Sequence, residues 1–143
     1  MKWLFGSAMT SVLVLLGMSI ALSDARSDSA SDAAPGAGIY KVQDGNKVDP
    51  KTLLGWKTWR ALACERCHGA EQEGLVGPPL VQSLKVLTKE QFHTTIMNGR
   101  PEKGMPPFNG SAMVNENWEG LYAYLKGRAD GKIQPGHLYP MDK

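Results

Sequence analysis

The sequence of 143 residues has few of the features that would place it in a common protein class. It contains two cysteines, which excludes a scaffold held together by several disulfides. Its formal net charge is only +2 and no run of basic residues occurs, so nothing in its charge favours nucleic-acid binding. Alternating strand-like patterns are almost absent and no internal repeat is visible. Information about function must therefore come from short motifs.

The two cysteines lie together in the motif Cys64-Glu65-Arg66-Cys67-His68. Two thiols separated by two residues and followed by histidine are the signature of covalent heme attachment. A thioredoxin-like dithiol would be expected within a βαβ pattern, and the sequence shows no such pattern. A structural zinc site requires four ligands, and the sequence shows no second pair of ligands at a suitable spacing. The motif therefore predicts one covalently bound heme c, with Cys64 and Cys67 attached to the porphyrin and His68 bound to the iron.

The N-terminal segment has the pattern of an export signal. Lys2 gives a positive start, residues 3–22 are almost wholly apolar or small, and Asp24 follows. This pattern predicts a signal peptide over residues 1–23 and hence a periplasmic protein. The alternative is an uncleaved membrane anchor, because the apolar run approaches the roughly 20 residues that a membrane span requires.

The remainder of the chain divides into a linker and one domain. Residues 24–38 are rich in Ser, Asp, Ala and Gly and are expected to form a flexible linker, and residues 39–143 have the length of one small domain. Helices are expected from the Asp49-Pro50 cap up to Gly69, over 80–87, after the capping box that begins at Thr88, and after an Asn115 cap. These patterns predict an all-α domain wrapped around its cofactor.

The iron needs a second axial ligand unless its distal side is open. Met105 is the favoured candidate because prolines stiffen its loop (Gly104-Met105-Pro106-Pro107-Phe108) and the glycine permits close approach. A thioether ligand raises the reduction potential and favours electron transfer. Met113, expected in a polar loop, is the second choice, and core packing explains Met97. Two further candidates are expected at the surface: His93 and His137.

The order of these motifs resembles class I cytochromes c over most of residues 53–130. The resemblance rests on Gly55 and Trp59 in the helix before the heme motif, Gly77-Pro78-x-Leu80 after it, the methionine loop, and LYAYL in the last helix. It implies the class I cytochrome c fold, a small helical domain around one heme. It also implies that Gly55 lies where the first and last helices cross.

The resemblance also implies roles for individual site residues. His68 and Met105 are expected to be the iron ligands. The carbonyl of Pro78 is expected to accept a hydrogen bond from His68 Nδ1, which would orient the imidazole ring. Leu80 is expected to form an apolar wall of the heme pocket.

A narrower resemblance comes from the second half of the chain. The segment from Leu80-Val81-Gln82 through Asn98-Gly99-Arg100 to the LYAYLK helix is similar to the soluble cytochromes c that accept electrons from PQQ-dependent alcohol dehydrogenases of the methanol and ethanol types. It implies a monomeric periplasmic electron carrier, not an enzyme, that passes electrons towards a terminal oxidase or a second cytochrome. Alternatives are a tethered subunit of another periplasmic oxidoreductase complex and a heme sensor or enzyme with an open distal site.

Basic residues are candidates for a docking face toward such a partner. Weak electron-transfer encounters are often small and steered by charge. If charge steers this encounter, electron transfer from the dehydrogenase is expected to slow as the salt concentration rises. The candidate residues are Lys57, Lys85, Lys89, Arg100 and Lys103.

Overall fold

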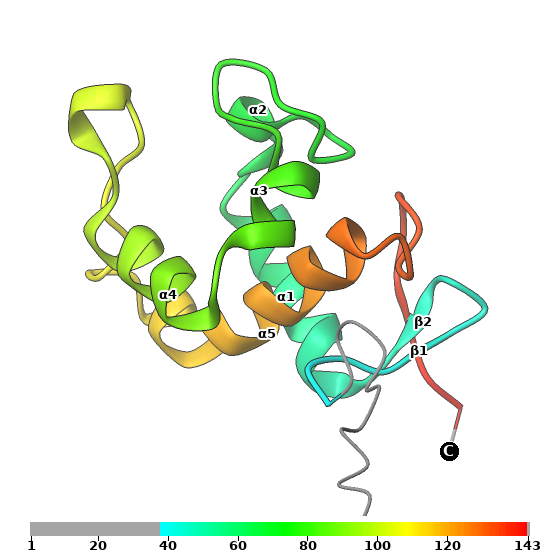
Figure 1. Ribbon diagram of the computed structural model, residues 1–143. Helices are drawn as coiled ribbons and strands as arrows, with labels where there is room; N and C mark the ends of the chain where they lie inside the picture. Colours follow the sequence, from blue (N-terminus) through cyan, green and yellow to red (C-terminus); the bar gives the residue numbers. More distant parts are fainter. Residues whose placement is uncertain (1–37, 143) are drawn as a thin grey trace, which may run out of the picture. The chain divides into compact units, whose positions relative to one another are not determined.

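Helices dominate residues 38–142, the part of the chain that the computed structural model describes (Figure 1). The expected signal peptide and all but the last residue of the expected linker lie outside these residues. The described residues fall within one compact unit. The elements are β1 (Val42–Gln43), β2 (Lys47–Val48), α1 (Pro50–Ala61), α2 (Glu65–His68), α3 (Leu80–Val86), α4 (Lys89–Asn98), the 3-10 turn η1 (Pro101–Lys103), α5 (Ala112–Ala129) and β3 (Tyr139–Pro140).

The centre of the fold is the crossing of α1 and α5 (Figure 1). The two helices approach closely because each has a glycine at the crossing. A Cβ atom on Gly55 would overlap the backbone carbonyl of Gly120, and one on Gly120 would overlap the carbonyl of Lys51. The expected place of Gly55 is thus confirmed. Trp59, only 2% exposed, packs beside it with its ring edge toward Tyr124.

The helix starts follow from local capping, with one correction. Asp49 accepts a hydrogen bond from the Thr52 N–H (3.1 Å), and Thr88 forms the predicted capping box with Gln91. The predicted Asn115 cap of the last helix is wrong. Ser111 caps α5 instead, accepting from the Val114 N–H (3.4 Å), so the helix begins four residues before Asn115 would have started it. Because Val114 is fully buried, this first turn is drawn into the core.

A small sheet was not predicted from the sequence. β1 pairs antiparallel with β2 through a turn at Asp44 and Gly45, whose φ angles are +54° and +77°. β3 pairs parallel with β2 and comes from the C-terminal segment. Each strand has two residues, too few to show an alternating pattern. The C-terminal segment is held by burial of Ile133 and Leu138 against the helices.

Candidate heme site

The heme motif lies on a short helix after a sharp break in the chain. α1 ends at Ala61, not at residue 69 as predicted, because Ala63 adopts a left-handed conformation with φ of +52°. The chain then forms α2, in which the Cys67 and His68 N–H groups both donate to the Cys64 carbonyl (3.2 and 3.0 Å). Cys64, Cys67 and His68 are therefore brought onto one helical turn.

The two thiols have different surroundings. Both are free; Cys64 is half-buried and Cys67 is exposed. Burial, followed by the negative charge of Glu65, raises the pKa of Cys64 to about 11. Glu65 is ion-paired through one oxygen with Arg60 (3.3 Å), and its other oxygen is buried with no hydrogen-bond partner among residues 38–142. Burial therefore disfavours the thiolate form of Cys64.

His68 is oriented by the loop that follows the motif. Its Nδ1 lies 3.0 Å from the carbonyl oxygen of Pro78, the contact that the family resemblance implies. With Nδ1 acting as donor to this carbonyl, Nε2 is the nitrogen left to bind a metal. Gly77 allows this approach, since a Cβ atom there would lie 2.9 Å from the imidazole ring. The Gly77 N–H also donates to the Cys67 carbonyl (2.8 Å), which closes the loop onto α2.

Two polar residues that sequence reasoning missed anchor this loop. Gln72 is 1% exposed and has φ of +63°, and its amide donates to the Tyr124 hydroxyl (3.1 Å). The Arg128 guanidinium donates to Gln72 Oε1 (2.6 Å), to the Ile133 carbonyl (2.7 Å) and to the Glu71 carbonyl (3.0 Å). The loop after the heme motif is thereby tied to α5 and to the C-terminal segment. No local pattern marks Gln72, because the partners that tie it to α5, Tyr124 and Arg128, lie more than 50 positions away.

Met105 lies on a loop that projects from the end of α4. Its N–H and carbonyl both bond to the backbone of Arg100 (3.1 and 2.8 Å), forming a narrow antiparallel bridge around η1. Gly104 closes the loop in a left-handed conformation, with φ of +82°. Beyond Met105, the Phe108 N–H donates to the Ile96 carbonyl (3.1 Å), so both ends of the loop are attached to α4. Met105 is half-buried within it.

The other candidate ligands occupy different positions. Met97 packs against the hydrophobic core, as expected. Met113 is 42% exposed in the first turn of α5, not in a polar loop as predicted. His93 packs on the Trp118 ring, with centroids 4.2 Å apart, and His137 packs between Trp56 and Tyr139. Met97, His93 and His137 thus each have a packing role of their own, whereas Met113 is largely exposed.

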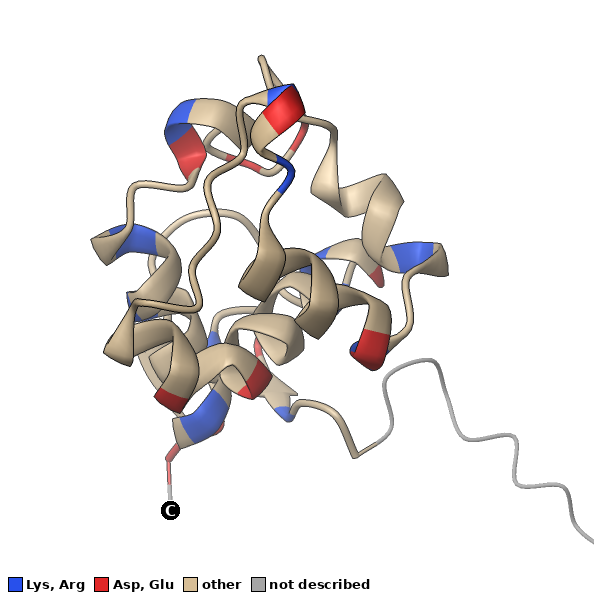
Figure 2. Ribbon diagram, turned by 90° about the vertical axis from the view of Figure 1, so that its left-hand side faces the viewer, with Lys and Arg blue, Asp and Glu red and all other residues tan. Residues whose placement is uncertain are grey.

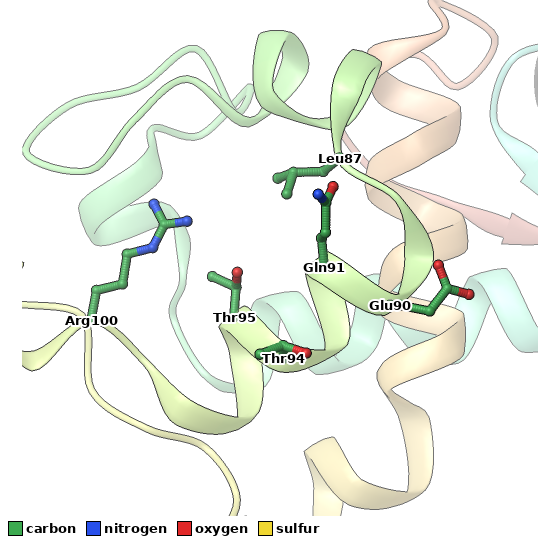
Figure 3. A pocket seen from close by; sticks show the side chains of 6 residues that line it. All are labelled: Leu87, Glu90, Gln91, Thr94, Thr95 and Arg100. Carbon is green, nitrogen blue, oxygen red and sulfur yellow. The ribbon is translucent and has the colours of Figure 1, made fainter.

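An open pocket of about 390 Å³ lies along one side of α4 (Figure 3). Its walls come from α4 and from the two segments that flank it. None of the heme-site residues predicted from the sequence lines it, but Arg100, a candidate for the docking face, does. The lining residues are Leu87, Glu90, Gln91, Thr94, Thr95 and Arg100.

The donor set fits a covalently attached heme. It consists of two free thiols on one turn and an imidazole whose Nδ1 is already engaged. Zinc held by protein side chains alone would need more ligands, and residues 38–142 contain no group of three or more His, Cys, Asp or Glu side chains able to hold a metal ion. Leu80, expected to be a pocket wall, is half-buried at the edge of the core.

Comparison with known proteins agrees with this geometry. A family model described as cytochrome c oxidase, cbb3-type, subunit III, matches residues 50–125. Cytochrome c-555 of Methylococcus capsulatus (strain Bath) is 44% identical over 92 residues, which cover 64% of this chain and 73% of that protein. The crystal structure of the c-type cytochrome XoxG from Methylobacterium extorquens AM1 is similar with a TM-score of 0.65 and 33% identity, over 73% of this chain and 67% of that chain.

The chain therefore belongs to the c-type cytochrome family. Its cofactor is heme c, and it is an electron carrier and not an enzyme. The predicted helical cytochrome fold and the predicted cofactor are both confirmed. Within residues 38–142, no helix is both long and apolar enough to cross a membrane.

Proposed function

We propose that this protein is a periplasmic monoheme electron carrier with His68 and Met105 as its axial ligands. In this proposal it accepts electrons from a PQQ-dependent alcohol dehydrogenase and passes them to a terminal oxidase or a second cytochrome. The observation that carries the proposal is the contact between His68 Nδ1 and the Pro78 carbonyl, which leaves Nε2 for the iron. When bound, the heme supplies a one-electron couple between ferric and ferrous iron.

Each residue of the site has a defined task. Cys64 and Cys67 would hold the porphyrin through thioether bonds, and Pro78 would keep the His68 ring in one orientation and make it a stronger donor. Met105 would complete the coordination with a soft sulfur ligand, which raises the reduction potential. Its bridge to Arg100 restrains the loop backbone, so little further order is lost when the sulfur binds.

Substitution of the two candidate methionines tests the ligand assignment. Ferric heme with a methionine ligand has a near-infrared charge-transfer band. We expect Met105→Ala to abolish this band and to let the reduced protein bind carbon monoxide, whereas Met113→Ala should leave both properties as in the wild type. Loss of the band in Met113→Ala alone would transfer the ligand role to Met113. A wild-type protein without the band that binds carbon monoxide would instead indicate an open distal site.

The surface beside the heme motif supports direct contact with a protein donor. Leu75 and Val76 are 75% and 82% exposed. They lie in the loop after the heme motif, which the hydrogen bond from the Gly77 N–H to the Cys67 carbonyl closes onto α2. Exposed apolar side chains that lie together mark interaction sites more often than isolated ones. The expected basic docking face is less evident, because Figure 2 shows acidic and basic positions interspersed and Lys89 is ion-paired with Glu119 (2.6 Å).

Stopped-flow reduction by a purified PQQ-dependent alcohol dehydrogenase tests the donor and its contact. We expect the dehydrogenase to reduce the holoprotein at a rate that saturates with concentration. The rate constant of Leu75→Ser/Val76→Ser should be about tenfold lower, because a loss of ~1.4 kcal/mol of contact energy has this effect. Lys57→Ala/Lys85→Ala is the matched control and should retain the wild-type rate. A rate that falls steeply with salt and with the lysine substitutions would favour the charge-steered contact instead. No reduction at any concentration would exclude this class of donor.

Export is proposed from the N-terminal pattern and from the site of c-type heme attachment, which lies outside the cytoplasm in bacteria. Sequencing of the mature protein from a periplasmic fraction is expected to find an N-terminus at Asp24 or at Arg26, following cleavage after Ser23 or Ala25.

A second candidate is favoured by the description of the matching family model, which names an oxidase subunit. A tethered subunit would keep Met1 or its neighbours, remain with the membrane fraction and co-purify with partner chains. A free protein that begins near Asp24 would exclude this candidate.

A further inference from the structure

The side chains of Arg100 and Met105 are placed on the same side of their loop. The two residues form a hydrogen-bonded antiparallel pair, in which the Arg100 N–H donates to the Met105 carbonyl and the Met105 N–H donates to the Arg100 carbonyl. Side chains of residues directly opposite one another in such a pair extend from the same face. If the Met105 sulfur faces the heme, as proposed above, then the Arg100 guanidinium must extend toward the heme as well.

The pocket along α4 supplies the surroundings of this guanidinium. Figure 3 shows the Arg100, Thr95 and Leu87 side chains pointing toward a common space, whereas Glu90 points away from it. Arg100 forms no ion pair with any acid among the described residues of the chain. The positive charge of Arg100 therefore faces the pocket, with the Thr95 hydroxyl group and the apolar Leu87 side chain beside it. These groups suit a ligand that combines a carboxylate with an apolar body.

The heme has this combination. Its propionate carboxylates lie on the edge of the porphyrin away from the vinyl groups that the cysteines bind. The cysteines are on α2, whereas the pocket is on α4, an element separate from α2 in the fold (Figure 1). An arginine can hold a carboxylate through two parallel hydrogen bonds.

We propose that Arg100, with the Thr95 hydroxyl beside it, binds a propionate carboxylate of the heme. This rests on the proposed ligation by Met105, because the bridge couples the two side chains. The guanidinium offsets the negative charge of the propionate, which otherwise favours the ferric form. Arg100 thereby raises the reduction potential in addition to the effect of the sulfur ligand.

Three substitutions in the full holoprotein test this binding site. Arg100→Leu removes the charge and keeps the backbone bridge, Arg100→Lys retains a cation, and Lys103→Leu removes an exposed cation from the same loop. The reduction potential is measured by spectroelectrochemistry, and the propionate carboxylate bands by redox-difference infrared spectroscopy of protein with carboxyl-labelled heme. The charge-transfer band is recorded for every variant.

We expect Arg100→Leu to lower the ratio of reduced to oxidised protein at fixed potential by about two- to tenfold, which corresponds to roughly 20–60 mV for a one-electron couple. One propionate band should shift in this variant. Arg100→Lys should recover most of the potential, and Lys103→Leu should match the wild type in both measurements.

The outcomes separate this inference from the proposed ligation. If the charge-transfer band is present throughout but the potential and the propionate bands of Arg100→Leu equal those of the wild type, Arg100 does not bind a propionate, and Met105 still stands as the ligand. If Lys103→Leu lowers the potential as much as Arg100→Leu, the effect is one of general charge and the site is overturned. If the band is missing from the wild type, the ligation itself is wrong.

Discussion

The two sides of the heme site are held by different kinds of contact. On the His68 side, the Pro78 carbonyl orients the imidazole, and the loop is fixed to α5 through the bonds of Gln72 with Tyr124 and Arg128. On the Met105 side, the loop is fixed by backbone hydrogen bonds to its own neighbours, and its residues 101–104 and 106–107 are exposed. The His68 side is tied to α5 and to the C-terminal segment, whereas the Met105 side is a local structure attached to α4.

This difference determines which side should open first. Segments with exposed backbone hydrogen bonds and few buried contacts open with the lowest free energy. The methionine loop has this character. The loop after the heme motif is also largely exposed, but the buried Gln72 side chain ties it to α5. The histidine ligand should therefore persist under conditions in which the methionine contact is lost, and the following substitutions sharpen or break that contrast.

The largest effect is expected from Arg128→Ala. The substitution removes three hydrogen bonds and leaves buried Gln72 without its strongest partner, so the free energy of unfolding should fall by about 3 kcal/mol. Urea unfolding of the holoprotein, followed by far-ultraviolet circular dichroism, measures the change. The exposed Arg66 is the matched control, and Arg66→Ala should stay within about 0.5 kcal/mol of the wild type. Equal effects of the two substitutions would contradict the anchoring role of Arg128.

One glycine substitution on each side of the heme site allows the two sides to be compared directly. Gly77→Ala would place a Cβ atom 2.9 Å from the His68 ring, and we expect a loss of about 2 kcal/mol from overpacking. Gly104→Ala meets no atom within 4 Å, so only its left-handed conformation, with φ of +82°, opposes the substitution, at about 1 kcal/mol. Unfolding free energies give the comparison. A greater loss for Gly104→Ala would mean that the methionine loop is the more constrained side.

The smallest effect concerns the caps of α1, which leads to the heme motif, and α4, which leads to the methionine loop. Partial burial raises the pKa of Asp49, but hydrogen bonds from Thr52 and from the Lys41 N–H outweigh it and hold the pKa below its usual value. The folded pKa is thus below the unfolded one, so this stabilisation is complete above about pH 4 and is lost as the pH falls through the folded pKa. Thr88, the cap of α4, does not titrate.

Acid unfolding of Asp49→Asn tests this difference between the caps. Asparagine retains the capping geometry but has no ionisable carboxylate. The variant should lose less stability between neutral and acidic pH than the wild type. Thr88→Ser should leave the pH dependence unchanged. An unaltered acid transition in Asp49→Asn would show that other carboxylates control it.

The parts of the site that could be predicted are those encoded by neighbouring residues. The heme motif, the proline loop around Met105 and the caps at Asp49 and Thr88 are all defined by spacings of a few positions. The start of α5 was missed because Ser111 and Asn115 are both good caps, and burial of Val114 decides between them. The sheet was missed because its strands are too short to show a pattern.

The amino-acid sequence alone determined the chemistry of this protein, because two thiols and an imidazole on one turn need only be close in the chain. The tertiary structure decided how that chemistry is held in place. The bond between Arg128 and Gln72 joins residues 56 positions apart, and the bridge between Arg100 and Met105 assigns a direction to each side chain. Such contacts depend on which surfaces the packed helices bring together, and a linear pattern carries no record of that.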